Sequence, residues 1–255
     1  MASRMTLVFF PGIFDELTQI FRVQEKLDPL FPNAQLLQSI PYKDRTFSSL
    51  LNTVNHWIRK MLYVWLELPH TDIGQDVDVA RLSADGVADI AFGISRGAAT
   101  TLTRWAHATT HEAVPRLVVL EGCPDSIHNV LRFRFGSWMG ACVEWMLQQL
   151  TLYRSDGASA LKSVEHFPLH IPIAFVTSLG DTNVPASGTF DMVRRLRERG
   201  HRHVHLLVLQ DAHHNNYYSA SNRDRQAYKA FVHGLLEQYV LLEDMCPSRC
   251  VRQMC

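Results

Sequence analysis

The sequence has no excess of charge of either sign, no long apolar run and few cysteines. Its 25 Lys and Arg residues balance 25 Asp and Glu residues, so no basic footprint points to nucleic acid or to an acidic membrane surface. No apolar run reaches the roughly 18 residues that a membrane-spanning helix needs. The apolar run at 6–10 stops at Pro11-Gly12 and is too short for a signal-peptide core. We therefore expect a cytoplasmic protein without a transmembrane segment or a nucleic-acid partner.

The cysteines are too few and too unevenly spaced for a disulfide framework. Their number is odd and no secretory signal precedes them, which indicates reduced thiols. Three of them crowd the segment 246–255, where the spacing fits no common zinc site and the final cysteine rules out a prenylation signal. We expect this segment to be a frayed tail, and we expect no metal and no cofactor. The five are Cys123, Cys142, Cys246, Cys250 and Cys255.

What the sequence does contain is a regular alternation of apolar, β-type runs with helical patterns. With 47% hydrophobic residues, the 255-residue chain can bury a full core. Runs that are apolar on both faces indicate parallel strands covered on both sides, and the absence of repeats predicts one α/β domain. The expected strands are 6–10, 34–40, 89–92, 117–120, 171–177 and 204–209. The expected helices are 15–27, 47–66, 98–108, 189–199 and 227–242, and we interpret 126–170 as a mostly helical insertion.

One stretch, residues 87–100 (VADIAFGISRGAAT), combines a buried strand, a sharp turn and the start of a helix. A single serine, Ser95, stands at the tip of the turn, between Gly93 and Gly97. Glycine two residues before and after the serine relieves the crowding that such a turn creates. This strand–turn–helix setting is that of a nucleophile elbow.

A serine nucleophile needs a base that takes its proton and an acid that orients that base. In an open parallel sheet such groups lie on loops at the carboxyl ends of the strands. The loop after the strand 171–177 carries Asp181, and the loop after 204–209 carries His213 and His214. The chain order is then Ser, Asp, His.

With these features the chain resembles the α/β-hydrolases, from its first strand to its last helix and least of all across the insertion. The resemblance implies that Ser95 is the nucleophile and Asp181 the acid, while Asp125 stands where some members carry the acid instead. Many members have a small residue, Ala, any residue and His in the histidine loop, often with Tyr three residues later. Residues 211–217 fit that frame if His214 is the base, and His213 remains the alternative.

The resemblance also implies an oxyanion hole made of two backbone N–H groups. The residue after the nucleophile, Arg96, supplies one of them. The other belongs to the loop after the first strand, Pro11-Gly12-Ile13, so we expect Ile13 to donate it, with Phe14 as the alternative donor and a candidate pocket residue.

Typical members of the fold have two antiparallel strands before this loop. Here the loop begins at residue 11, so we expect those strands to be missing and the sheet to be short, with about six mostly parallel strands flanked by helices. The expected organisation is one hydrolase domain at 1–245, a small helical lid at about 126–170, and the tail 246–255.

The implied chemistry is attack on a carboxylic ester or thioester through an acyl-enzyme, with a small acyl compound as substrate. Substrate choice belongs to the insertion. Its Trp138 and Trp145 would suit an apolar acyl chain, and its Arg132 and Arg134 an anionic head group. An acyltransferase, or a non-catalytic binding or receptor protein on the same fold, is the alternative. The filled triad favours an enzyme, whereas acyl length, leaving group and oligomeric state are not encoded in any readable pattern.

Overall fold

A computed structural model of the chain describes residues 6–10, 35–38, 89–106, 114–150, 159–214, 216–218 and 221–241. The expected helices at 15–27 and 47–66, the loop residues Ile13 and Phe14, and the tail 246–255 lie outside these ranges. Within them, no helix is both long enough and apolar enough to cross a membrane.

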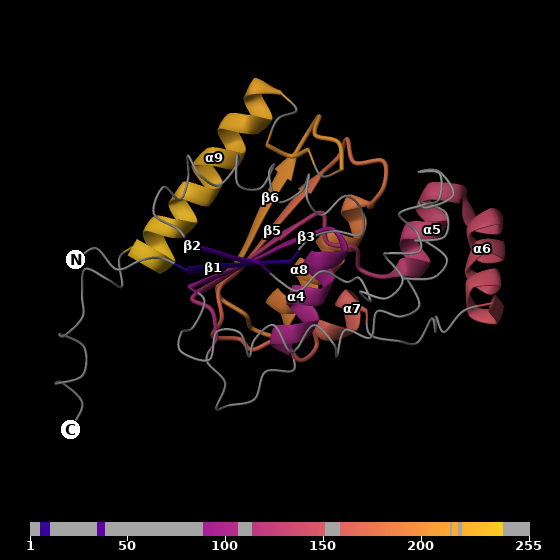
Figure 1. Ribbon diagram of the computed structural model, residues 1–255, viewed down its shortest axis with the longest axis horizontal. Helices are drawn as coiled ribbons and strands as arrows, with labels where there is room; N and C mark the ends of the chain where they lie inside the picture. The colour runs from indigo at the N-terminus through magenta and orange to yellow at the C-terminus, as the bar shows by residue number, and fades with distance from the viewer. Residues whose placement is uncertain are drawn as a thin grey trace, which may run out of the picture.

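The described strands form one six-stranded sheet in which every neighbouring pair is parallel (Figure 1). The strand order is β2-β1-β3-β4-β5-β6, so the chain builds outward from β1 first to one side and then to the other. Ligands of such sheets bind at the point where the order of strand addition changes direction. That point lies at the carboxyl ends of the two strands on either side of it, here β1 and β3. The strands are β1 (Thr6–Phe10), β2 (Gln35–Gln38), β3 (Ile90–Ile94), β4 (Leu117–Glu121), β5 (Ile173–Ser178) and β6 (Val204–Leu209).

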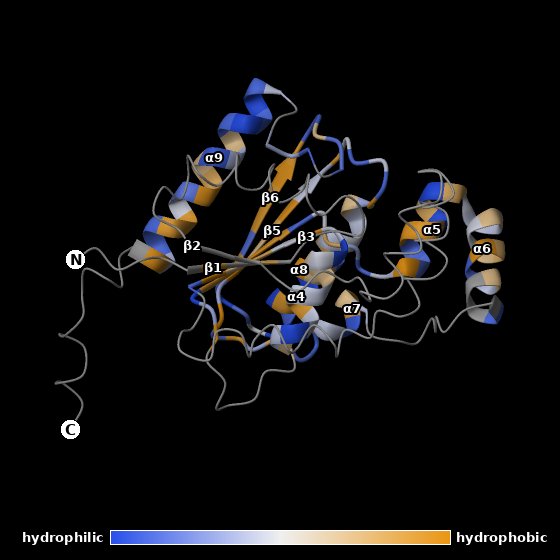
Figure 2. Cartoon of the chain, in the orientation of Figure 1, coloured by the Kyte–Doolittle hydropathy of each residue, from blue (hydrophilic) through white to orange (hydrophobic). Residues whose placement is uncertain are grey.

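Helices cover both faces of the sheet, as runs that are apolar on both faces require. Helix α9 (Asn222–Leu236) packs on one face, and α4 (Arg96–Ala106), α7 (Ala160–Ser163) and α8 (Ala186–Glu198) lie on the other. Side chains alternate along a strand, so the buried side chains form two hydrophobic clusters, one on each face of the sheet. Ile90 and Phe92 of β3 belong to the cluster under α9, and Ala91 belongs to the cluster under α4, α7 and α8. The hydropathy colouring shows apolar strands at the centre and a polar outer stripe on α9 (Figure 2).

Three helices begin earlier than their apolar spacing predicts: α4 by two residues, α8 by three and α9 by five. Helix α9 starts at Asn222 rather than 227, because the Ser221 side chain accepts a hydrogen bond from the Asp224 N–H at 3.1 Å and caps the helix. Helix α8 starts at Ala186, directly after Pro185, rather than at 189. A polar first turn carries no apolar periodicity, so only the cap marks it. Helix α9 continues into a short π-helix, η2 (Glu237–Leu241).

The insertion is mostly helical over its described residues, as expected, and residues 164–170 form turns. Helices α5 (Ile127–Phe135) and α6 (Ser137–Leu150) are joined at Gly136, whose φ of 80° only glycine adopts easily. They pack against each other so closely at Gly140 that a Cβ there would lie 2.8 Å from the Arg132 Cα. This α5–α6 hairpin projects to one side of the sheet, with α6 farther from it than α5 (Figure 1).

Candidate active site

Ser95 occupies the turn between β3 and α4 in a strained backbone conformation. Its φ of 55° makes it the one non-glycine residue with a positive φ in the ranges that the structure describes. The Ser95 N–H donates to the Glu121 carbonyl oxygen at 2.7 Å, which ties the turn to the end of β4. A Cβ on Gly93 would lie 2.6 Å from the Ala98 Cα, so only glycine lets α4 turn back so tightly over the strand. The side chain of Ser95 thus projects at the carboxyl edge of the sheet.

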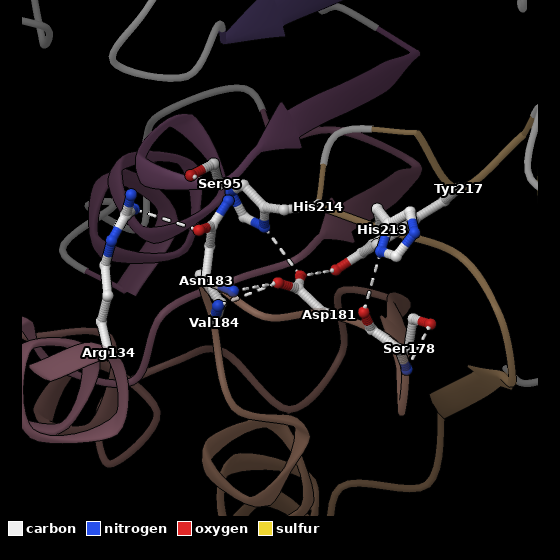
Figure 3. Close-up of polar contacts among 10 residues, drawn as sticks. Ser95, Arg134, Ser178, Asp181, Asn183, Val184, His213, His214 and Tyr217 are labelled. Atoms are coloured by element: carbon white, nitrogen blue, oxygen red, sulfur yellow. Dashed lines mark hydrogen bonds and ion pairs between the residues drawn. The ribbon is translucent and has the colours of Figure 1, made fainter. Parts of the chain in front are cut away.

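Ser95, His214 and Asp181 form a continuous series of hydrogen bonds (Figure 3). The Ser95 hydroxyl donates to His214 Nε2, with 2.9 Å between the two atoms. His214 Nδ1 lies 2.7 Å from Asp181 Oδ2 and donates to it, because a carboxylate can only accept. The structure therefore brings together three residues that lie 86 and 33 positions apart in the chain.

The carboxyl group of Asp181 accepts hydrogen bonds at both oxygens, and the Asp181 side chain is fully buried. Its Oδ1 accepts from the backbone N–H groups of Asn183 at 2.8 Å and Val184 at 2.9 Å. Burial acts to raise the pKa of this carboxyl, but hydrogen bonds from His214, Tyr217 and Val184 favour the charged form and hold the pKa below its usual range. Asp181 is therefore a carboxylate at neutral pH and can stabilise a positive imidazole.

Tyr217 is a member of the site that the sequence does not identify. Its hydroxyl donates to Asp181 Oδ2 at 2.6 Å, the same oxygen that His214 contacts, and the side chain is 1% exposed. Burial, and then the charge of Asp181, raises the pKa of this phenol well above its usual value, so it remains a donor. Gly122, at a φ of 53°, makes the space: a Cβ there would lie 2.7 Å from the Tyr217 hydroxyl and 3.1 Å from the His214 ring. Many α/β-hydrolases have a tyrosine three residues after the histidine, but this spacing does not reveal where the tyrosine hydroxyl points.

Asp224 fixes the start of the loop that carries His214. This buried carboxylate, in the first turn of α9, accepts from the Gln210 N–H at 3.1 Å and the Asp211 N–H at 2.8 Å. The loop is therefore held to α9 as well as to β6. In the sequence Asp224 looks like an ordinary acidic residue near a helix start, which hides this contact.

The two alternative site residues bond elsewhere. The Asp125 carboxylate accepts from the Ser126 N–H at 2.6 Å and from Asn129 Nδ2 at 2.5 Å, at the start of α5. His213 Nδ1 donates to the Gly180 carbonyl oxygen at 3.2 Å, and its side chain is exposed. Neither residue takes part in the series that links Ser95 to Asp181.

The other residues expected at the site lie outside the triad itself. Arg96 is the first residue of α4, so its backbone N–H lies in the first turn, at the positive end of the helix dipole. Trp138 and Trp145 lie on α6, with 79% and 62% of their surface exposed, and their role in a substrate pocket stays a prediction. Among the described residues, no group of three or more His, Cys, Asp or Glu side chains could hold a metal ion.

Comparisons with solved structures show similarity at the level of the fold. An acylaminoacyl peptidase from Pyrococcus horikoshii is 14% identical with a TM-score of 0.60, over 92% of this chain and 37% of its own. An esterase from Pyrococcus furiosus is 14% identical with a TM-score of 0.60, over 93% and 83%. The esterase domain of a Rhodothermus marinus protein is 13% identical with a TM-score of 0.53, over 94% and 90%. The chain thus spans little more than a third of the peptidase.

Sequence comparison places the chain in a family. No curated protein sequence matches it. The model of the prolyl oligopeptidase family, however, matches residues 89–239, which run from the elbow strand to the last helix. Because this match covers more than half of the chain, the chain belongs to the prolyl oligopeptidase family, and the solved structures show that it has the α/β-hydrolase fold.

Proposed function

We propose that the protein cleaves carboxylic esters or thioesters through an acyl-enzyme, with Ser95 as nucleophile, His214 as general base and Asp181 as its orienting acid. The observation that supports this most is the series of hydrogen bonds at 2.9 and 2.7 Å that links the three side chains. A hydroxyl that donates to a neutral imidazole, itself oriented by a carboxylate, is the arrangement that activates serine near neutral pH.

The chemistry proceeds in two balanced halves. Ser95 Oγ attacks the acyl carbon while its proton passes to His214 Nε2, and the resulting imidazolium is stabilised by Asp181. The N–H of Arg96, together with a second N–H that we assign to Ile13, holds the oxyanion, and each such donor typically lowers the barrier by roughly 3–4 kcal/mol. The imidazolium then protonates the departing alcohol or thiol. A water molecule enters, His214 takes its proton, and the acid is released with the Ser95 hydroxyl restored.

A peptide bond is the second candidate target. The family is named for oligopeptidases, and one of the similar structures is an acylaminoacyl peptidase. The same serine chemistry cleaves amides and esters, so the triad does not choose between them. Matched substrates with one acyl group, a 4-nitrophenyl ester and a 4-nitroanilide, separate the two: we expect Ser95-dependent turnover of the ester and none of the anilide. Turnover of the anilide that is lost in Ser95→Ala would favour the peptidase.

Labelling with a fluorophosphonate probe tests the catalytic assignment. We expect the wild type to be labelled and Ser95→Ala to be unlabelled, because the probe reacts with an activated serine. His214→Ala should lose labelling and ester turnover by at least about a thousandfold, whereas His213→Ala should keep most of both. Circular dichroism and thermal melting of each variant show that it is folded.

Three results would contradict the proposed assignment, and each points to a different alternative. A folded wild type that is not labelled would leave the non-catalytic binding protein as the explanation. Loss of activity in His213→Ala but not in His214→Ala would exchange the two histidines. Release of acyl groups only when an acceptor alcohol is supplied, rather than to water, would indicate an acyltransferase.

A further inference from the structure

Arg134 connects the α5–α6 hairpin to the loop after β5, which we call the acid loop (residues 179–185). Its Nη1 donates to the Asn183 Oδ1 at 3.0 Å (Figure 3). The Asn183 N–H in turn donates to Asp181 Oδ1 at 2.8 Å. The guanidinium is thus two hydrogen bonds away from the carboxylate of the candidate triad, and its side chain is exposed. A permanent positive charge therefore lies at the rim of the site.

Among the described residues, Arg134 has no carboxylate partner, in contrast to Arg194 and Arg195 of α8. On α8, Arg194 pairs with Asp191 at 3.0 Å and with Glu198 at 3.2 Å, and Arg195 pairs with Glu165 at 2.6 Å. In the part of the chain that the structure describes, no carboxylate lies within ion-pair distance of Arg134. Within the described residues, the guanidinium that lies two hydrogen bonds from the candidate triad therefore has no acidic partner.

The acidic side chains that flank this region are already engaged. Asp181 accepts four hydrogen bonds, and Asp125 bonds to the first turn of α5. Arg134 lies 5.9 Å from the centre of the Phe135 ring, which supports the face of the guanidinium. A guanidinium has five N–H donors, and Asn183 occupies one of them. The remaining donors can bind a carboxylate that comes from outside the chain.

We propose that Arg134 is a specificity residue that binds a free carboxylate on the acyl group of the substrate. The preferred substrates are then half-esters or half-thioesters of dicarboxylic acids, whose second carboxylate meets Arg134 while the ester carbonyl meets Ser95. This inference rests on the proposed ester hydrolysis and narrows it to an anionic substrate class. Because the carboxylate stays remote from the bond that breaks, its contact acts on binding and changes KM rather than kcat.

Two 4-nitrophenyl esters of similar length test the proposal: the hydrogen glutarate, with a free carboxylate, and the uncharged valerate. We expect wild-type kcat/KM to be roughly tenfold higher for the hydrogen glutarate, as an exposed charge-assisted contact provides. Arg134→Gln should remove this preference by raising KM for the anionic ester alone. Arg134→Lys should keep part of it, and Arg194→Gln, which removes a distant surface arginine, should leave it unchanged.

The variant kinetics separate recognition from a structural role. If Arg134 only anchors the acid loop, Arg134→Gln lowers kcat for both esters equally, and the proposal is wrong. An equal preference for the two esters in the wild type also overturns it, while ester hydrolysis itself stands.

If neither ester is hydrolysed, the proposed function is wrong, and a binding measurement then tests carboxylate recognition by Arg134 on its own. Calorimetry on Ser95→Ala with monomethyl glutarate and with methyl valerate reports recognition without turnover. We expect the anionic ligand to bind roughly tenfold more tightly than the neutral one, and the double variant Ser95→Ala/Arg134→Gln to lose this difference. Equal binding of the two ligands to Ser95→Ala would overturn the proposal.

Discussion

Within the described part of the chain, the phenol of Tyr217 makes one hydrogen bond, to Asp181, and the effect of removing it can be predicted. In Tyr217→Phe, Asp181 Oδ2 keeps only His214 as a donor, so the negative charge of the carboxylate is less satisfied. This change raises the pKa of Asp181 toward its usual value and makes the carboxylate hold a protonated imidazole more strongly. We expect kcat to fall roughly tenfold to a hundredfold with KM nearly unchanged, in line with the loss of a hydrogen bond to a charged group. The acidic limb of the pH–rate profile should move to higher pH.

Steady-state kinetics of ester hydrolysis between pH 5 and 9 measure both effects. Tyr218→Phe is the matched control, because that neighbouring ring packs edge-on against Tyr228 at 5.8 Å and carries no hydrogen bond to the triad. A Tyr217→Phe enzyme with an unshifted profile and a lower melting temperature would mean that the residue only fills space.

At the scale of the element, the elbow depends on how closely α4 approaches β3. Gly93→Ala places a Cβ 2.6 Å from the Ala98 Cα and from the Gly97 carbonyl oxygen, both of which are backbone atoms that cannot rotate away. We expect the free energy of unfolding to fall by about 1–3 kcal/mol, as for other overpacked sites. Because the helix must shift, fluorophosphonate labelling of Ser95 should slow as well.

Urea denaturation and labelling rates measure this prediction. Gly234→Ala in α9 is the control, since nothing lies within 4 Å of the added Cβ, and alanine in a helix is typically about 0.5–1 kcal/mol more favourable than glycine. A Gly93→Ala protein as stable and as reactive as the wild type would contradict the close packing of this turn.

The elements themselves were largely predictable, because a buried parallel strand needs a continuous apolar run. All six strands lie within two residues of their expected bounds at either end, and β1 and β6 match at both. Helix starts were less accurate: the polar residues Asn222 to Gln226 carry no apolar spacing, so only the Ser221 cap marks the start of α9. Apolar runs and apolar spacing identify the middle of a strand or helix better than its ends.

The candidate site was predictable where the topology left few choices. The loop after β5 offers one carboxylate, and the loop after β6 offers two adjacent histidines together with Asp211. The structure joins Asp181 and His214 to Ser95. Which histidine faces the serine depends on the loop conformation, as do the direction of the Tyr217 hydroxyl and the contact of Asp224 with the loop backbone. Contacts between residues that are distant in sequence leave no periodic signal.

At the scale of the molecule, the α5–α6 hairpin differs from the body of the protein. The strands β3, β4 and β5 are buried on both faces, whereas Phe133, Trp138 and Trp145 of the hairpin are exposed, and its two helices pack mainly on each other. Few buried contacts mean a low free energy of local opening. We expect amide hydrogens of α5 and α6 to exchange faster than those of the three strands, by at least about a hundredfold.

Hydrogen–deuterium exchange followed by mass spectrometry on the intact chain measures this difference directly. Peptides of α8, which packs on the sheet, provide the comparison for a helix of the body. If the hairpin exchanged only as slowly as the strands, it would open only when the whole domain unfolds, and a lid that moves independently would have to be abandoned.

The backbone of Ser95 has a consequence for how such a chain can change over evolution. A residue held at a φ of 55° is more comfortable as glycine, so the substitution that best relaxes this turn is the one that deletes the hydroxyl. Selection for thermal stability alone would thus drive this position toward an inert protein. A serine at a position whose backbone favours glycine is explained by the proposed role of Ser95 as nucleophile and not by the stability of the fold.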